Sequence, residues 1–554
     1  MRGRNGVDMR KGTAGERSRQ AFWIGLAILV TGTLSFFYWA GKKQVWFCDE
    51  IYTYESANGF EQPWPNTNVD QWMTGDDVEA YFAADWNVLS LNDISVRLYS
   101  DHVPLYFWLF RMISVLCFRG SGSIWIGLSM NLVFYLAVLA LCYGVFLRLT
   151  KSPIASGAAT ILTGIVNRVM LEQATALRMY MMLLLAELLL LLGGVWILRG
   201  ARRKKMSAGV FLYLFAVSVA GFLTHYDYWI FYAVTAAMFC LWLLFQAVKE
   251  KGKKFWSAWE FRYAAAWVGN FLLSLLATIY LFPYCRWNLN RGKGQTALYS
   301  LLNFSEDKGR QIVWGYQRLA ASIFGDAFPA AAALLLLFGC IAGGGVILYR
   351  KREREKLAVL ILAVLIAQAY QFAVCFTLPA AWEERYLWGV FTIMILCMAW
   401  GGILLLEELL RILKEKELAP VLTRCGISLL CIGILAWELA VIDGGNGVAY
   451  LFHPDKDVAV LKEHGNIPWL VYGPLGGVYS YYDWIIPEQI CFVTEENTPE
   501  DADAVRAMPG DSFVLYAFEE YLPTALDFFR QELGRELHAE YLTKSTNLTV
   551  YLIQ

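Results

Sequence analysis

Long runs of uncharged residues constrain this chain more than any other feature of its sequence. The first run, Ala21–Ala40, contains no charged residue and is long enough for a helix to cross the hydrocarbon core of a bilayer. Similar runs recur at about 123–148, 153–167, 179–199, 207–223, 228–248, 262–282, 325–349, 357–378, 386–405 and 421–442. The sequence therefore predicts an α-helical polytopic membrane protein with about eleven transmembrane helices.

The first run does not read as a cleaved signal peptide. Its apolar part is longer than a signal-peptide core, and it ends in SFFYWAGKK, an aromatic and basic interface belt where a cleavage site would need small residues. We therefore expect residues 1–20 to form a cytoplasmic N-terminus and residues 21–442 to form the transmembrane domain.

Composition excludes several other classes of protein. Only 17% of the residues are charged, whereas a soluble chain carries roughly a quarter. The net charge is −1 and no basic domain stands out, so nothing indicates a nucleic-acid partner. The 11 cysteines include no CxxC pair, and no disulfide framework is indicated.

Basic residues collect on alternate loops. These loops read RLTKS (148–152), RGARRKK (199–205), KEKGKK (249–254), YRKREREK (349–356) and RILKEKE (411–417). By the positive-inside rule they are cytoplasmic, together with the N-terminus. The external segments are then 41–122, about 168–178, 224–227, 283–324, 379–385 and the tail after 443. Most of the unusual polar residues lie there, close to span ends, where different helices can bring side chains into one cavity.

The first external loop, 41–122, is too long to be a structureless connection. DDVEAYFAADWNVL (76–89) places apolar residues at roughly helical spacing and predicts an amphipathic helix in the membrane interface. DHVPLYFWLFRMISVLCF (101–118) contains Arg111 and is short for a crossing, so we expect an interfacial or re-entrant helix that begins at Pro104.

The tail after Asp443 has a different composition. Apolar bursts at 468–473, 489–494, 511–518 and 548–554 predict strands, and the stretches around 455–464 and 523–534 predict helices. We expect residues 443–554 to form a small extracytoplasmic α/β domain that serves for docking or structure.

Short motifs on the external side resemble those of a known family. They read DEIYTYESANG (49–59), DHVPLYFW (101–108), ATALRMYMMLL (174–184), LTHYDYWIF (223–231) and EERYLWGVF (383–391). Over about residues 20–405 the chain resembles the polytopic GT-C glycosyltransferases, in particular the bacterial members of glycosyltransferase family 39 related to protein O-mannosyltransferases and aminoarabinose lipid A transferases. Two positions depart from the pattern: Val103 stands where a proline is usual, and the proline often seen after the last motif is absent.

The resemblance implies a reaction, a membrane location and a set of site residues. A sugar would move from a polyprenyl-phosphate-linked donor to a glycan, lipid or protein acceptor on the external face of the cell membrane. An inverting transfer needs a base near the acceptor hydroxyl and cations at the phosphate. Asp49 and Glu50 are the catalytic candidates. The residues implied to bind substrate are His102, Tyr106, Arg178, Tyr180, His225, Tyr226, Arg385 and Tyr386, with Arg291 and Lys293 as further phosphate candidates.

Several alternatives stay open at this point. Asp49 and Glu50 can be a structural cap, or one of them can contact a divalent metal as in some members of the family. We expect the two acids not to share a proton, because neighbours in an extended segment point in opposite directions. Glu187 is expected to pair with Arg111 or Arg168, because an unpaired acid inside the bilayer is costly. Competing functions are a lipid-linked glycan transporter or flippase and a surface-glycan polymerase or ligase.

Overall fold

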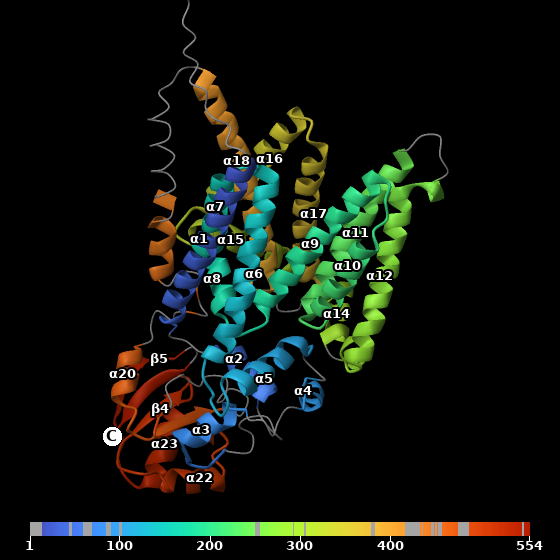
Figure 1. Ribbon diagram of the computed structural model, residues 1–554. Coiled ribbons are helices and arrows are strands. Elements are labelled where there is room, and N and C mark those ends of the chain that lie inside the picture. Colours follow the sequence, from blue (N-terminus) through green and yellow to red (C-terminus); the bar gives the residue numbers. More distant parts are fainter. Residues whose placement is uncertain are drawn as a thin grey trace, which may run out of the picture.

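The computed structural model describes most of the chain. The described residues are 14–43, 47–58, 69–84, 90–98, 102–249, 255–291, 293–303, 306–377, 383–415, 433–434, 436–444, 448, 451, 457–474, 487–545 and 548–554. Figure 1 shows long helices side by side, with a small sheet at one end of them, the sheet end. The opposite end, the basic end, carries Arg148, Arg203, Lys249, Arg350 and Arg411 near the ends of the long helices.

Eight helices in the described part are long and apolar enough to cross a membrane. They are α1 (Ala14–Ala40), α6 (Trp125–Thr150), α9 (Tyr180–Arg203), α11 (Tyr226–Lys249), α12 (Trp259–Leu281), α16 (Ala330–Arg350), α17 (Arg354–Thr377) and α18 (Trp388–Glu415). Helix α10 (Ala208–Phe222) is apolar and shorter. The predicted fold class, a polytopic helical membrane protein with a small C-terminal sheet region, is confirmed. The last predicted span, 421–442, falls mostly outside the described residues.

The predicted span 153–167 belongs to a bent pair of helices. Helix α7 (Pro153–Thr160) and the π-helical turn η2 (Ile161–Ile165) lead into α8 (Arg168–Thr175), with a bend of 57°. Asn167 explains the break, because its side chain accepts hydrogen bonds from the first amides of α8 and starts a new helix there. The bend turns α8 into the buried interior of the bundle.

Small residues allow two of the spans to touch. A Cβ on Gly401 of α18 would lie 2.2 Å from the Cys340 carbonyl oxygen of α16, and a Cβ on Gly344 would lie 2.6 Å from the Gly401 Cα. Both positions therefore need glycine, as is common where membrane helices approach closely. This contact fixes the middle of α18, and the Arg385 motif lies at its N-terminal end.

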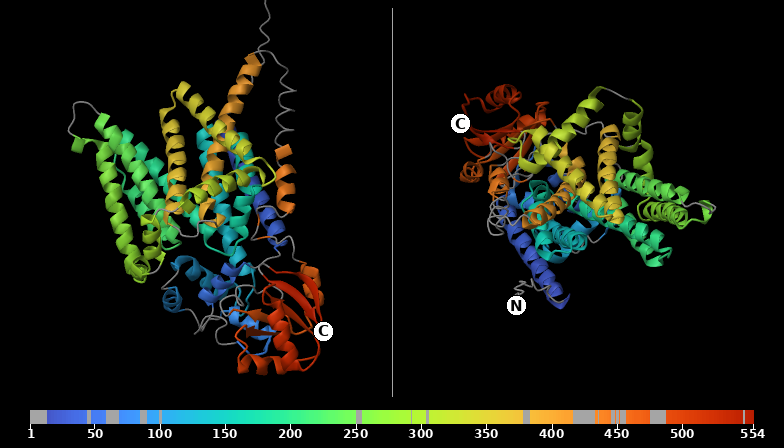
Figure 2. Two further views of the ribbon diagram at one scale, coloured as in Figure 1. Left: turned by 180° about the vertical axis from the view of Figure 1, so that it is seen from behind. Right: turned by 90° about the horizontal axis from the view of Figure 1, so that it is seen from above.

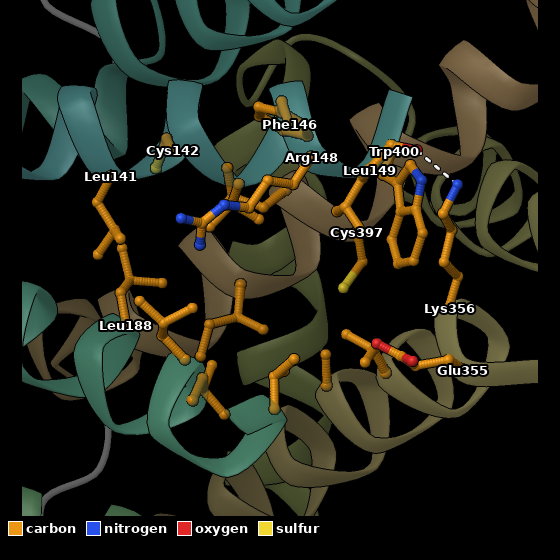
Figure 3. Close-up of a pocket in the computed structure, with 18 of the residues that line it drawn as sticks. Leu141, Cys142, Phe146, Arg148, Leu149, Leu188, Glu355, Lys356, Cys397 and Trp400 are labelled. Atoms are coloured by element: carbon orange, nitrogen blue, oxygen red, sulfur yellow. Dashed lines mark hydrogen bonds between the residues drawn. The ribbon is translucent and has the colours of Figure 1, made fainter. Parts of the chain in front are cut away.

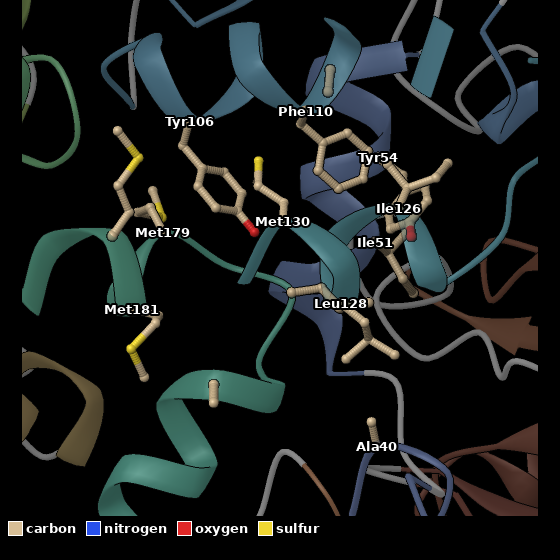
Figure 4. Close-up of a cluster of buried hydrophobic side chains, with 14 of the residues drawn as sticks. Ala40, Ile51, Tyr54, Tyr106, Phe110, Ile126, Leu128, Met130, Met179 and Met181 are labelled. Carbon is tan, nitrogen blue, oxygen red and sulfur yellow. The ribbon is translucent and has the colours of Figure 1, made fainter. Parts of the chain in front are cut away.

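The described residues of the loop 41–122 form four helices: α2 (Cys48–Asn58), α3 (Gly75–Phe82), α4 (Asn92–Arg97) and α5 (Leu105–Cys117). Helix α3 begins in a capping box between Thr74 and Asp77, and the part of the predicted helix at 85–89 lies outside the described residues. Helix α5 begins directly after Pro104, as predicted. Side chains of α2 and α5 pack with the start of α6, as seen for Tyr54, Phe110 and Ile126 (Figure 4).

The described residues of the loop 283–324 are also mostly helical. It contains α13 (Cys285–Arg291), α14 (Lys293–Leu302) and α15 (Glu306–Phe324). Two short 3₁₀ helices, η3 (Phe255–Ser257) and η4 (Glu384–Leu387), precede α12 and α18. Helix α15 packs against α16, α17 and η4, so this loop covers part of the bundle.

The tail forms a sheet that also takes in a strand of the first loop. The strands are β1 (Met73–Thr74), β2 (Trp469–Gly473), β3 (Gln489–Thr494), β4 (Phe513–Ala517), β5 (Ala539–Lys544) and β6 (Thr549–Ile553), in the order β1-β3-β2-β4-β6-β5. Strand β2 pairs in parallel with β3 and β4, and the remaining pairs are antiparallel. Helices α20 (Val458–Glu463), α22 (Pro499–Arg506) and α23 (Leu522–Leu533) complete the unit. The four predicted strands coincide with β2, β3, β4 and β6, whereas β5, α22 and β1 were not predicted.

Strand β1 ties the membrane domain to the tail. Met73 and Thr74 pair with Ile490 and Gln489 of β3, and Trp72 donates a hydrogen bond from Nε1 to the Ala504 carbonyl oxygen at 2.8 Å. The first loop and the tail therefore form one structural unit at the sheet end, which the left view of Figure 2 shows against one end of the bundle.

Candidate active site

Helix α2 carries both predicted catalytic acids in its first turn. Glu50 helps to start this helix, because its Oε2 accepts a hydrogen bond from the Phe47 amide at 3.0 Å. Its Oε1 accepts from Lys43 Nζ at 3.0 Å and from the Leu177 amide at 2.7 Å. The side chains of Lys43 and Glu50 are both fully buried. Glu50 therefore joins the end of α1, the start of α2 and the segment before α9.

Burial dominates the electrostatics of Glu50. Loss of solvent raises the pKa of its carboxyl group, against the lowering effects of Lys43 and of the Leu177 and Phe47 amides. The carboxylate has a donor on each oxygen and is closed off from solvent, which leaves it little freedom to contact a substrate.

Asp49 faces another part of the molecule. Its Oδ2 lies 2.8 Å from a terminal nitrogen of Arg385, which belongs to η4 at the start of α18. The two side chains are 18% and 12% exposed, so both remain accessible. The Arg385 guanidinium also lies 5.3 Å from the centre of the Phe47 ring and 5.4 Å from that of Tyr386. These aromatic faces hold the cation over the start of α2.

Arg178 links α2 to the histidine of the first loop. It donates to the Asp49 carbonyl oxygen at 2.9 Å and to Thr53 Oγ1 at 3.1 Å. Its other terminal nitrogen lies 3.2 Å from His102 Nε2. Because a guanidinium has no acceptor, His102 Nε2 must accept this hydrogen bond. Three predicted motifs thus meet through one arginine.

Tyr180 and His225 form the neighbouring wall. The Tyr180 ring lies 5.9 Å from the His225 ring and 5.1 Å from the Trp388 ring, centre to centre. His225 Nδ1 accepts a hydrogen bond from the Asp227 amide at 3.1 Å and lies 3.3 Å from Asp227 Oδ2. The side chain of His225 is therefore oriented by its own helix start.

A small cavity of about 10 Å³ lies beneath this wall. Tyr180, Arg385, Tyr386 and Trp388 line it, together with Glu187 of α9. Its volume is close to that of a single water molecule. Neither carboxylate oxygen of Glu187 has a hydrogen-bond partner among the described residues. The predicted pairing of Glu187 with Arg111 or Arg168 is therefore wrong; Arg111 contacts Ala57, Ser90 and Asp93 instead.

Two of the predicted substrate contacts lie in the packing behind the site. Tyr106 is fully buried and donates to Asn131 Oδ1 at 3.3 Å. The Tyr226 hydroxyl accepts a hydrogen bond from Asn288 Nδ2 at 2.7 Å. The side chains of Arg291 and Lys293 lie outside the described part of the structure.

Sequence reasoning missed two residues of the cluster, Lys43 and Thr53. Lys43 belongs to the SFFYWAGKK belt, which predicts a lysine at the lipid surface, and the structure buries it against Glu50.

The cluster does not define a metal centre. Within the described ranges, no group of three or more His, Cys, Asp and Glu side chains is placed to hold a metal ion.

The fold defines a multi-pass membrane protein with a polar cluster where four motif-bearing segments meet at the sheet end. No family model matches the chain, and no curated protein sequence matches it. Among solved structures it is similar to ArnT from Cupriavidus metallidurans bound to undecaprenyl phosphate, with 10% identity, a TM-score of 0.48 and coverage of 95% of this chain and 97% of that one.

Two archaeal structures are similar as well. The oligosaccharyltransferase AglB from Archaeoglobus fulgidus, in complex with an inhibitory peptide and a dolichol-phosphate, has 11% identity, a TM-score of 0.45 and coverage of 89% and 69%. The apo Archaeoglobus fulgidus oligosaccharyltransferase has 12% identity, a TM-score of 0.44 and coverage of 93% and 69%. These are the class of membrane transferase that the motifs resemble. These similarities concern the path of the backbone, and they assign no substrate or activity to this protein.

Proposed function

We propose that this protein is a membrane glycosyltransferase that moves a sugar from a polyprenyl-phosphate-linked donor to an acceptor hydroxyl on a glycan, lipid or protein. The observation that carries the proposal is the contact of Asp49 with Arg385, beside Arg178 and His102. A carboxylate and two guanidinium groups from three distant segments meet there at one end of the spans. This set suits proton removal next to a phosphate leaving group.

Asp49 would act as the general base. It accepts the proton of the acceptor hydroxyl while that oxygen forms a bond to the anomeric carbon of the donor. The bond from the anomeric carbon to the phosphate oxygen breaks, and the polyprenyl phosphate leaves with the electron pair. Arg385, with Arg178 behind it, would stabilise the negative charge that develops on the phosphate.

The contact between Asp49 and Arg385 would be the resting arrangement. A phosphate offers Arg385 the same bidentate partner as a carboxylate does, so a donor can replace Asp49 on this arginine. The replacement frees Asp49 to act as a base. The adjoining cavity of about 10 Å³ is far too small for a sugar, so donor binding must widen the gap between α2 and η4.

The test is an assay of the purified protein with a panel of polyprenyl-phosphate sugars, beginning with a mannosyl donor. Release of polyprenyl phosphate in the presence of an acceptor supports the proposal, and Asp49→Asn should abolish most of it. The matched control is Asp76→Asn, an exposed acid of the same loop. Lipid movement across vesicles without release of phosphate would favour a flippase and sink the proposal.

We further propose that the site faces the outside of the cell. The support is that the basic ends of the spans gather opposite the sheet end, and the positive-inside rule favours basic ends in the cytoplasm. A reporter that is active only outside the cytoplasm, fused after Gln554, should be active. Activity of a cytoplasmic reporter at that position would reverse the orientation.

A further inference from the structure

A second, larger cavity reaches from the basic end into the interior of the bundle, and the residues of the motif cluster are not among those that line it. It measures about 160 Å³ and lies between α6, α9, α17 and α18 (Figure 3). Its walls are almost entirely apolar, with Leu141, Val145, Leu188, Leu192 and Ile393 among the lining side chains. An apolar cavity of similar volume in other proteins stays dry and takes up hydrocarbon, so water is not its natural occupant.

The two ends of the cavity have different linings. Its lining along α9 runs from Leu188 to Arg199, which is about 16 Å of helix. The charged lining residues sit at one end of that length: Arg148 in the last turn of α6, Arg199 of α9, and Glu355 and Lys356 at the start of α17. The apolar residues line the remainder. The slot is therefore amphipathic along the helix axes, with its charged end at the membrane surface.

Cations dominate the charged end. Glu355 is already paired, with Arg199 at 2.5 Å and Arg202 at 3.7 Å. Lys356 donates to the Leu149 carbonyl oxygen at 2.8 Å and pairs with Glu353. Arg148 is exposed in the last turn of α6. Three cations against one carboxylate line this end and give it a net positive charge that suits a phosphate group.

We propose that this slot binds an anionic phospholipid of the surrounding leaflet, with one acyl chain in the apolar part and the phosphate at the arginine-rich end. The shape, the apolar lining and the position of the charges all match that occupant. Leu141, Val145 and Leu192 line the slot yet remain partly accessible, so it opens to its surroundings. The site is independent of the proposed transferase chemistry, because no residue of the motif cluster lines it.

Native mass spectrometry of the full-length protein tests the proposal. The delipidated protein is titrated with phosphatidylglycerol and, separately, with phosphatidylcholine that has the same acyl chains. We expect one phosphatidylglycerol to bind per chain, about five-fold more tightly than phosphatidylcholine, from the gain of one surface cation at the headgroup. Equal affinity for the two lipids would overturn the proposal, because the basic residues at the end of the slot would then not recognise the headgroup.

Two variants separate the parts of the site. Arg148→Gln should remove most of the preference for phosphatidylglycerol, whereas Arg350→Gln, an exposed arginine at the end of α16, should leave it unchanged. Leu192→Trp should fill the slot and weaken both lipids. If Leu192→Trp does not fold, the comparison of Arg148→Gln with Arg350→Gln decides alone, and equal effects of those two variants would refute a specific site.

Discussion

The two sides of the first turn of α2 present neighbouring carboxylates to very different surroundings. On one side Asp49 is partly exposed and pairs with the long side chain of Arg385, from far along the chain. On the other side Glu50 is fully buried and has donors on both oxygens, two of them backbone amides. The difference separates a carboxylate that can exchange partners from one that cannot.

The comparison also corrects an expectation from the sequence. We expected an extended segment with its two acids pointing in opposite directions, whereas residues 48–58 form a helix. On a helix, successive side chains diverge by about 100°. The acids still do not share a proton, because each turns to its own cation.

The largest effect should come from the buried side. Glu50→Gln removes the carboxylate that pairs with the buried Lys43, and breaking a buried ion pair costs about 3–5 kcal/mol. Thermal unfolding in detergent should show a clear loss of stability. The double variant Lys43→Met with Glu50→Gln should regain much of it. A single variant as stable as the parent would mean that Glu50 is not the structural member of the pair.

The exposed side should show the opposite behaviour. Asp49→Asn preserves shape and removes basicity, so turnover in the donor assay should fall by about 10²–10⁴-fold while the unfolding temperature stays close to that of the parent. Donor binding should remain. If Asp49→Asn keeps its turnover and a folded Glu50→Gln loses it, the roles of the two acids are reversed.

The fold could be predicted from the sequence more completely than the site. Runs of apolar residues are local, so spans such as α6 and strands such as β4 were predicted close to their observed positions. Strand β1 was missed because two residues carry no periodic pattern, and its partner β3 lies over 400 residues away.

The site shows the same limit. Motif resemblance named Asp49, Arg178 and Arg385, but the pairing of Glu50 with Lys43 depends on how α1 ends and α2 begins. A lysine at the end of a span normally turns to the lipid surface, and only the fold reverses that preference. The surroundings of Glu187 also depend on the fold. Gly389 of α18 lies so close that a Cβ on it would be 2.3 Å from the Glu187 carboxylate.

A smaller effect should follow from loss of the partner of Asp49. Arg385→Ala removes a charge-assisted hydrogen bond that contributes roughly 1.5–3 kcal/mol, so the apparent KM for donor should rise or turnover should fall by about 10- to 150-fold. Stability should change little, because the side chain is partly exposed. Unchanged kinetics would remove Arg385 from the phosphate site.

The smallest effect concerns a second pair of carboxyl groups. These two groups contact each other, whereas Asp49 and Glu50 of α2 point to different partners. Asp70, beside β1, contacts Asp501 of α22. Burial would raise the pKa of Asp501, but the hydrogen bond from Asp70 and the donors of Thr494 and Thr498 together hold it below its usual value. Burial and the hydrogen bond to Asp501 raise the pKa of Asp70 to about 7.

The raised pKa gives the docking of β1 a pH dependence. Because the docked state binds the proton of Asp70 more tightly than the undocked state, docking is strongest at low pH and weakens as the pH rises from about 4 through 7. Hydrogen exchange of the Asp70 amide, which donates to the Phe492 carbonyl oxygen at 2.8 Å, should therefore be slower at pH 5.5 than at pH 8 after correction for intrinsic rates. Asp70→Asn should make protection independent of pH, and Asp76→Asn should not. Equal protection at both pH values in the parent would show that Asp70 is ionised in the docked state and that the two carboxyl groups share no proton.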